Sequence, residues 1–144
     1  MPRRGIELNH TLSYLKLTLP HQFQVAIIEN MKSTLAELSM EFAANVTRMC
    51  DNIKNRAHIK NQILRSGCSI GANIHEAQYA YSRDDFAFKL QIALKECNET
   101  FYWLELLKRT ETVTPDVLQP LVNQCTRIRF LLSKSLNTTK KKNS

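Results

Sequence analysis

The sequence is poor in residues that interrupt helices, with three glycines and four prolines among 144 residues. It also lacks any apolar run near the roughly 20 residues that a membrane span needs, although 43% of its residues are hydrophobic. These shortages disfavour a fold of many short strands and a membrane protein, and favour long helices. No continuous apolar segment follows Arg3 and Arg4, which argues against a signal peptide.

The cysteines do not form a metal-binding pattern. Cys50, Cys68, Cys97 and Cys125 contain no CxxC pair, and their spacings of 18, 29 and 28 residues fit no zinc module. Each lies near the apolar face of a helical pattern, so we expect four buried free thiols. Free thiols in turn indicate a reducing, cytoplasmic location.

A set of catalytic or metal-binding residues is also missing. No Glu-x-x-His motif is present for a di-iron site, and His75 directly precedes Glu76, so the two point to different helix faces. Ser66 and Cys68 share no three- or four-residue step with His75, and a helix surface offers no preformed oxyanion hole. We therefore expect no enzyme activity, no metal and no cofactor.

Four amphipathic helical patterns fill most of the chain, over about 30–53, 57–80, 82–109 and 114–136. Their apolar stripes are Leu35, Leu38, Phe42, Val46, Met49 and Ile53; Ile59, Ile63, Gly67, Ile70, Ile74 and Ala77; Phe86, Leu90, Ala93, Cys97, Phe101, Leu104 and Leu107; and Leu118, Leu121, Cys125, Ile128 and Leu132. The sequence predicts an all-α protein, an up-down-up-down antiparallel four-helix bundle over 27–137.

Both flanks of the predicted bundle are basic. Of the formal net charge of +7, residues 1–26 hold +2 and residues 138–144 hold +3, which leaves +2 for 27–137. We expect 1–26 to be an N-terminal extension that is helix or strand by its pattern, and 138–144 to be a disordered basic tail. The total charge is therefore weak evidence about the bundle itself.

Helix-capping residues mark three of the predicted starts. Asn55 is a candidate N-cap for the second helix, Ser82 precedes two aspartates at the start of the third, and Thr114 precedes Pro115 at the start of the fourth. These signals support short turns between the helices.

Small residues, Gly67, Ser69 and Gly71, occupy the middle of the second helix. Each glycine costs a helix roughly 1 kcal/mol relative to alanine, so we expect a neighbouring backbone to approach closely there. A loop at SGCSIGAN is the alternative. A phosphate loop is disfavoured because no strand precedes the glycines and no Gly-Lys-Ser/Thr ending follows them.

Polar residues border the stripes of the second and third helices. They suit either a ligand-binding patch or a network joining these helices or neighbouring subunits, and we favour the network. The residues are Asn73, Glu76, Lys89, Lys95, Glu96 and Glu99.

Basic residues gather around two turns that an up-down bundle places at one end. Only Asp51 opposes those of the first turn, and contact with phosphate and a solvated helix end are both open interpretations. No aromatic stacking platform or RNA-binding signature indicates base readout. The residues are Arg48, Lys54, Arg56, Lys60, Arg65, Lys108 and Arg109.

Additional apolar positions widen the stripes beyond one face, and oligomerisation would cover them. They are Ile92, Leu94, Trp103, Leu106, Val122, Phe130 and Leu131.

The segments RSGCSIGANIHEA (65–77), IALKE (92–96) and YWLELL (102–107), with IEN at 28–30, resemble the 23S ribosomal RNA intervening-sequence proteins. The resemblance covers about 27–136, and Cys68 departs from the threonine or other small residue usual at its position. It implies a cytoplasmic bacterial four-helix bundle that assembles as a homopentamer ring. A related branch, the accessory variability determinant of diversity-generating retroelements, partners a reverse transcriptase and nucleic acid. The family has no catalytic residues to carry over, and its motif residues are structural.

The leading hypothesis is a non-enzymatic oligomer that binds nucleic acid, or a nucleic-acid enzyme such as a reverse transcriptase, through repeated basic patches. The alternative is a structural or protein–protein interaction module without a nucleic-acid role.

Overall fold

The structure, a computed structural model, describes residues 20–141, which contain four helices and no strand. The helices are α2 (His21–Asp51), α3 (Ala57–Ala77), α4 (Arg83–Arg109) and α5 (Pro115–Lys141). The chain divides into two compact units, Met1–Ser33 and Thr34–Ser144, and the bundle belongs to the second. The predicted all-α fold is confirmed.

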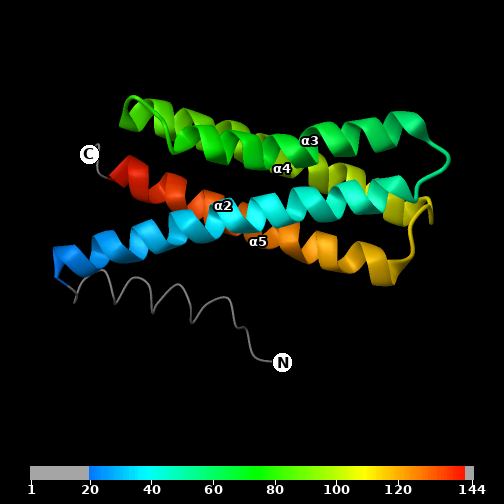
Figure 1. Cartoon of the computed structure of the whole chain (residues 1–144), viewed down its shortest axis with the longest axis horizontal. Coiled ribbons are helices and arrows are strands. Elements are labelled where there is room, and N and C mark those ends of the chain that lie inside the picture. Colours follow the sequence, from blue (N-terminus) through cyan, green and yellow to red (C-terminus); the bar gives the residue numbers. More distant parts are fainter. Residues whose placement is uncertain (1–19, 142–144) are drawn as a thin grey trace. The chain divides into compact units, whose positions relative to one another are not determined.

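Within the second unit the helices run up, down, up and down. Figure 1 shows the α2–α3 and α4–α5 turns at one end of this unit and the α3–α4 turn at the other. The prediction of an antiparallel four-helix bundle therefore holds, and the two turns rich in basic residues do share one end.

The outer boundaries differ from the predicted ones. Residues 1–19, most of the predicted extension, and 142–144 lie outside the described residues, but 21–26 already belong to α2. The predicted disorder of 138–141 is wrong, because α5 continues to Lys141. No glycine or proline interrupts it there, and the Thr138 and Thr139 hydroxyls donate to carbonyls one turn back at 3.0 and 2.9 Å.

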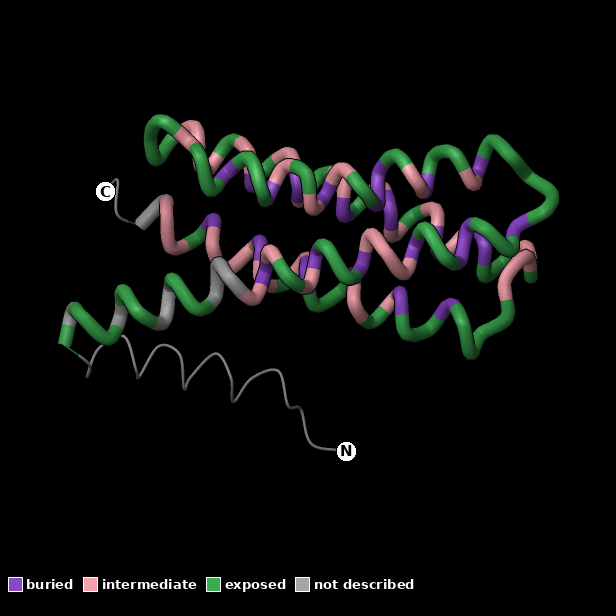
Figure 2. Tube along the Cα trace, viewed as in Figure 1, coloured by how far each residue is buried: buried purple, intermediate pink, exposed green. Residues whose placement is uncertain are grey.

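The core consists of the predicted stripes. Figure 2 shows the buried positions along the inner faces of the helices. Leu38, Phe86 and Phe101 are half-buried instead of buried, and they pack against the core from its border. Burying such stripes supplies most of the stability of a bundle, since apolar area removed from water contributes about 25 cal/mol per Å².

The glycines of α3 lie against α2. A Cβ atom on Gly67 would come within 3.2 Å of Val46 Cγ1, and one on Gly71 within 3.4 Å of the Ser39 backbone oxygen. The predicted close approach of a neighbouring backbone is confirmed at Gly71, whereas Gly67 faces the Val46 side chain. The alternative of a loop at SGCSIGAN is wrong, because α3 is continuous from Ala57 to Ala77.

The expectation of four buried thiols is wrong for Cys68, which is exposed, whereas Cys50, Cys97 and Cys125 are fully buried. Successive helical residues lie about 100° apart, so Cys68 turns away from the core that its neighbour Gly67 contacts. Burial raises the pKa of Cys50 to about 11. The Sγ atoms of Cys97 and Cys125 lie 3.5 Å apart where α4 meets α5.

The turns at the shared end use residues with left-handed backbone. Asn55 does not cap α3; the N-cap is Arg56 at φ 66° and ψ 48°, with no side-chain cap. Glu111 in the α4–α5 turn has φ 49°. At the opposite end Ser82 caps α4 as predicted, since its Oγ accepts a hydrogen bond from the Asp85 backbone N–H at 3.1 Å.

Candidate nucleic-acid interface

The end of the bundle formed by the α2–α3 and α4–α5 turns carries six of the predicted cations, here named the basic end. They come from the last turn of α2, the α2–α3 turn, the first turn of α3 and the last turn of α4. The residues are Arg48, Lys54, Arg56, Lys60, Lys108 and Arg109.

Local structure fixes two of these cations. The Arg48 guanidinium donates to Asn45 Oδ1 at 2.7 Å, and the Asn45 amide donates to Gln124 Oε1 at 3.2 Å, which links α2 to α5. Arg109 pairs with Glu105 one turn earlier at 3.1 Å, and 75% of the Arg109 side chain is exposed.

The other four cations form no ion pair with a carboxylate among residues 20–141. The ion pairs between described residues use Arg65, Lys89 and Arg109, and none involves Lys54, Arg56, Lys60 or Lys108. Lys54, Arg56 and Lys108 are exposed, and Lys60 is half-buried. Their charges therefore remain open to a polyanion.

Carboxylates at the same end reduce its net charge. Asp51, Glu105, Glu111 and Asp116 oppose the six cations, which leaves a net of +2. Asp51 is the acid that the sequence pattern places at the first turn, and the carboxylates near the α4–α5 turn add to it. The positive charge is therefore concentrated on the α2–α3 side of the basic end.

Arg65, the seventh predicted cation, does not belong to the basic end. Its guanidinium bridges Glu96 at 3.1 Å and Glu99 on α4, and Glu99 also accepts from Trp103 Nε1 at 3.2 Å. The hydrogen bond to Arg65, and then that to Trp103, lower the pKa of Glu99. These four residues form the α3–α4 network, which neutralises Arg65.

These contacts agree with the network interpretation for Glu76, Lys89, Glu96 and Glu99, whereas Lys95 is exposed. Lys89 on α4 donates to Glu76 on α3 at 2.6 Å, a second link between the two helices. Ser69 and Asn73 instead donate to carbonyls one turn back within α3, at 2.7 and 2.8 Å. Glu76 and Lys89 therefore join α3 to α4, while Ser69 and Asn73 form hydrogen bonds within α3.

One polar contact between α3 and α4 was not predicted from the sequence. Thr100 is fully buried and hydrogen-bonds to Ser66, also fully buried, with 2.9 Å between the hydroxyl oxygens; Thr100 also contacts the Glu96 carbonyl oxygen at 2.8 Å. The signal was available, because Thr100 follows the buried stripe of α4 and Ser66 precedes Gly67.

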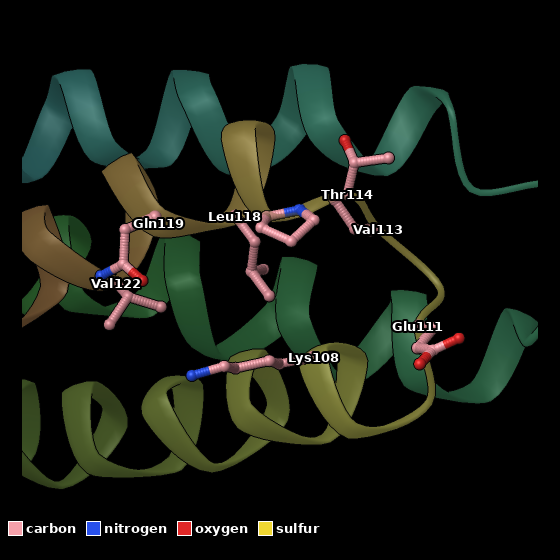
Figure 3. Close-up of a pocket in the computed structure, with 8 residues that line it drawn as sticks. Lys108, Glu111, Val113, Thr114, Leu118, Gln119 and Val122 are labelled. Carbon is pink, nitrogen blue, oxygen red and sulfur yellow. The ribbon is translucent and has the colours of Figure 1, made fainter.

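A shallow pocket of about 340 Å³ lies at the α4–α5 turn. Figure 3 shows the Lys108 side chain extended beside Leu118 and Val122 of α5, while Glu111 lies on the turn. Its lining is mainly apolar and holds a single cation and a single carboxylate.

A second set of cations, on α5, was also missed. Arg127 is exposed, Arg129 lies over the Phe101 ring at 4.9 Å, and Lys134 lies over the Phe130 ring at 5.4 Å. The predicted basic residues were those near turns, whereas Arg127, Arg129 and Lys134 lie within α5. The charge of each helix taken separately would have revealed them.

The described part of the chain offers no candidate for a metal site or for a membrane-spanning helix. Residues 20–141 contain no group of three or more His, Cys, Asp or Glu side chains placed to hold a metal ion. None of the four helices combines the length and apolarity that crossing a membrane requires.

Comparison with known proteins identifies the family. The model of the 23S rRNA-intervening sequence protein family matches residues 31–134. The solved structure of a protein with unknown function from the S23 ribosomal protein family of Bacteroides thetaiotaomicron is 44% identical in sequence. The match covers 74% of this chain and 98% of that chain, with a TM-score of 0.70. No curated protein matches the chain. Because the family model spans well over half of the sequence and the bundle agrees with it, the chain belongs to the 23S rRNA intervening-sequence protein family.

Proposed function

We propose that this protein acts in the bacterial cytoplasm by binding and not by catalysis, and that the basic end contacts nucleic acid or a nucleic-acid enzyme such as a reverse transcriptase. One observation carries the proposal: Lys54, Arg56, Lys60 and Lys108 lie at one end of the bundle without ion pairs to described carboxylates. Phosphates would supply the missing counter-charge, and release of their counterions would drive binding.

A homo-oligomer strengthens this proposal, because each added copy repeats the net +2 of the basic end. Two large side chains on α4 support assembly, since Phe88 and Tyr102 are 58% and 60% exposed. A contact with a neighbouring copy would remove these two rings from water. The molar mass in solution, measured by light scattering, tests the assembly and a five-fold ring directly.

The two left-handed turn residues offer a matched pair of variants for the binding test. Glycine adopts positive φ without steric cost, so Arg56→Gly and Glu111→Gly each keep the backbone of their turn while removing charges of opposite sign. We expect Arg56→Gly to weaken binding of labelled RNA and DNA oligonucleotides, measured by fluorescence anisotropy, and Glu111→Gly to strengthen it.

Three further measurements make this test decisive. Affinity should fall steeply as salt rises from about 50 to 200 mM, and Lys54, Arg56 and Lys60 replaced together by alanine should lower it further than Arg56→Gly. Replacing Lys140, Lys141 and Lys142 by glutamine shows what the C-terminal lysines contribute. Absence of binding at low salt, or binding unchanged by the triple replacement, contradicts the proposal.

The second candidate function is a structural or protein–protein interaction module. The specific observation for it is the opposing set of carboxylates at the basic end, together with the exposed Phe88 and Tyr102. This candidate predicts that Tyr102→Ala changes the oligomeric mass while the oligonucleotides remain unbound at every salt concentration.

A further inference from the structure

The charge of α5 is one-sided. Its 27 residues hold one acid, Asp116 in the first turn, and five basic residues, a net of +4. After Asp116 no acid follows before the helix ends at Lys141. A helix with this composition has a positive surface wherever its polar side faces solvent.

The structure holds the cations of α5 on aromatic rings. The ion pairs between described residues join α3 to α4 or lie within α4, and none involves Arg127 or Arg129. Arg129 and Lys134 lie instead over the rings of Phe101 and Phe130. The cation–π contact holds the Arg129 guanidinium over the Phe101 ring without neutralising its positive charge, so Arg129 is oriented yet able to meet an anion.

An aromatic ring lies at the centre of the outer side of α5. Positions at steps of four, three, four and three residues share one face of a helix, and five polar or aromatic residues follow that pattern, all exposed except the half-buried Lys134. We name them the α5 face: Asn123, Arg127, Phe130, Lys134 and Asn137. Phe130 is 42% exposed, and the cations on either side of it lie about 10 Å apart along the helix axis at 1.5 Å per residue.

We infer that the α5 face binds single-stranded nucleic acid, with a base stacked on Phe130 and neighbouring phosphates on Arg127 and Lys134. Proteins that bind single strands without sequence preference combine cations along the backbone with an aromatic ring for the bases. The face offers both, and the amides of Asn123 and Asn137 add hydrogen-bond donors and acceptors at its ends.

Two other occupants fit the α5 face less well. A duplex keeps its bases stacked inside, so the exposed ring would gain nothing from it. A membrane surface needs a broad apolar helix face, but the apolar side of α5, from Leu118 to Leu136, is buried in the core. An unpaired strand is the occupant that uses the ring and the cations together.

This inference rests on the proposed function but concerns a different surface, so the two can fail separately. The probes are short labelled oligouridine and oligothymidine and a duplex of the same length, each titrated with the full chain. The variant is Phe130→Ala. Its matched control is Tyr81→Ala, which removes an exposed ring from the α3–α4 turn.

We expect Phe130→Ala to weaken binding of both single strands by about tenfold or more, since stacking on one ring is usually worth that much. Binding by Tyr81→Ala, and duplex binding by Phe130→Ala, should change by less than twofold. Replacing Arg127 and Lys134 by glutamine should reduce the slope of log affinity against log salt by about 1.4, at roughly 0.7 per phosphate contact in single strands. Unequal losses for oligouridine and oligothymidine would show which strand the face prefers.

Each contrary outcome has a distinct meaning. If no probe binds at low salt, the proposed function and this inference both fail. If Arg56→Gly weakens binding while Phe130→Ala does not, the basic end is the binding surface and the α5 face is not. If Phe130→Ala changes the molar mass in solution, Phe130 lies between copies of the chain, and the inference is overturned.

Discussion

Helices α4 and α5 both have 27 residues and pack against each other, but they use their charges in different ways. Five acids balance five basic residues on α4, whereas one acid faces five basic residues on α5. Three carboxylates of α4, Glu96, Glu99 and Glu105, pair with Arg65 of α3 or with Arg109 of α4 itself, while Arg129 and Lys134 of α5 lie over aromatic rings. The comparison separates charge that holds helices together from charge left for a partner.

The interface between these two helices should be the slowest part of the bundle to open. Cys97 and Cys125 are fully buried there, whereas Cys68 is exposed on α3. In native buffer a thiol reagent should modify Cys68 at once, and it should modify Cys97 and Cys125 at least about a thousandfold more slowly. The reason is that each 1.4 kcal/mol of opening free energy slows labelling tenfold. Peptide mapping of the labelled sites measures this, and fast labelling of Cys125 would show that α5 detaches readily.

A buried hydroxyl should matter on α4 where an exposed one on α5 does not. Thr100→Val leaves Ser66 buried without its partner, so the free energy of unfolding should fall by about 1–3 kcal/mol. The matched change on α5, Thr126→Val, removes an exposed hydroxyl bonded to the Val122 carbonyl and should cost less than about 0.5 kcal/mol. In urea unfolding, adding Ser66→Ala to Thr100→Val should recover much of the loss.

The ion pairs of α4 should give its stability a dependence on pH that α5 lacks. Because Arg65 lowers the pKa of Glu99 in the folded state, this carboxylate stabilises the fold fully above its ordinary pKa of 4.5, and the contribution is lost as the pH falls below that value. Glu99→Gln should destabilise by roughly 0.5–1 kcal/mol at pH 7.

The control for this prediction is Arg129→Gln on α5, which removes a cation–π contact of similar size. In urea titrations at several pH values, the gap between wild type and Glu99→Gln should close below pH 4.5, where Glu99 becomes protonated. The gap for Arg129→Gln should persist, and a gap for Glu99→Gln that stays constant down to acid pH argues against the ion pair.

The smallest effect is expected from a change that alters packing without charge. A Cβ on Gly71 would meet Ser39 at ordinary contact distance, 3.4 Å, so Gly71→Ala should stabilise by about 0.5–1 kcal/mol through helix propensity. Gly67→Ala brings its Cβ within 3.2 Å of Val46, and the crowding should offset that gain. Thermal unfolding of both variants compares them, and equal stabilisation would mean that Val46 moves aside easily.

Periodicity was enough to predict the core, because burial in a bundle follows the helical repeat. Ile63, Ile70 and Ile74 needed only their spacing to be placed inside. Charge partners did not follow from spacing. Arg65 follows Lys60 by less than two helical turns in sequence. Its guanidinium nevertheless pairs with Glu96 and Glu99, because the packing of α3 against α4 turns Arg65 toward α4.

The backbone of the turns was equally hard to predict. Asn55 has the better propensity for capping, but Arg56 takes the cap position in a left-handed conformation that the turn geometry imposes. The cations of α5 could have been found from sequence. They were missed because basic residues were sought at helix ends, and those of α5 are spread along the helix.

The hydrogen bond between Ser66 and Thr100 also determines the register of α3 against α4. Apolar stripes tolerate sliding by one helical turn, since leucine and isoleucine pack acceptably in several places. A shift of one turn would leave the buried Ser66 hydroxyl without its partner, whereas Thr100 would keep its contact with the Glu96 carbonyl oxygen. That penalty selects one alignment, and the same alignment brings Arg65 opposite Glu96 and Glu99 on the surface.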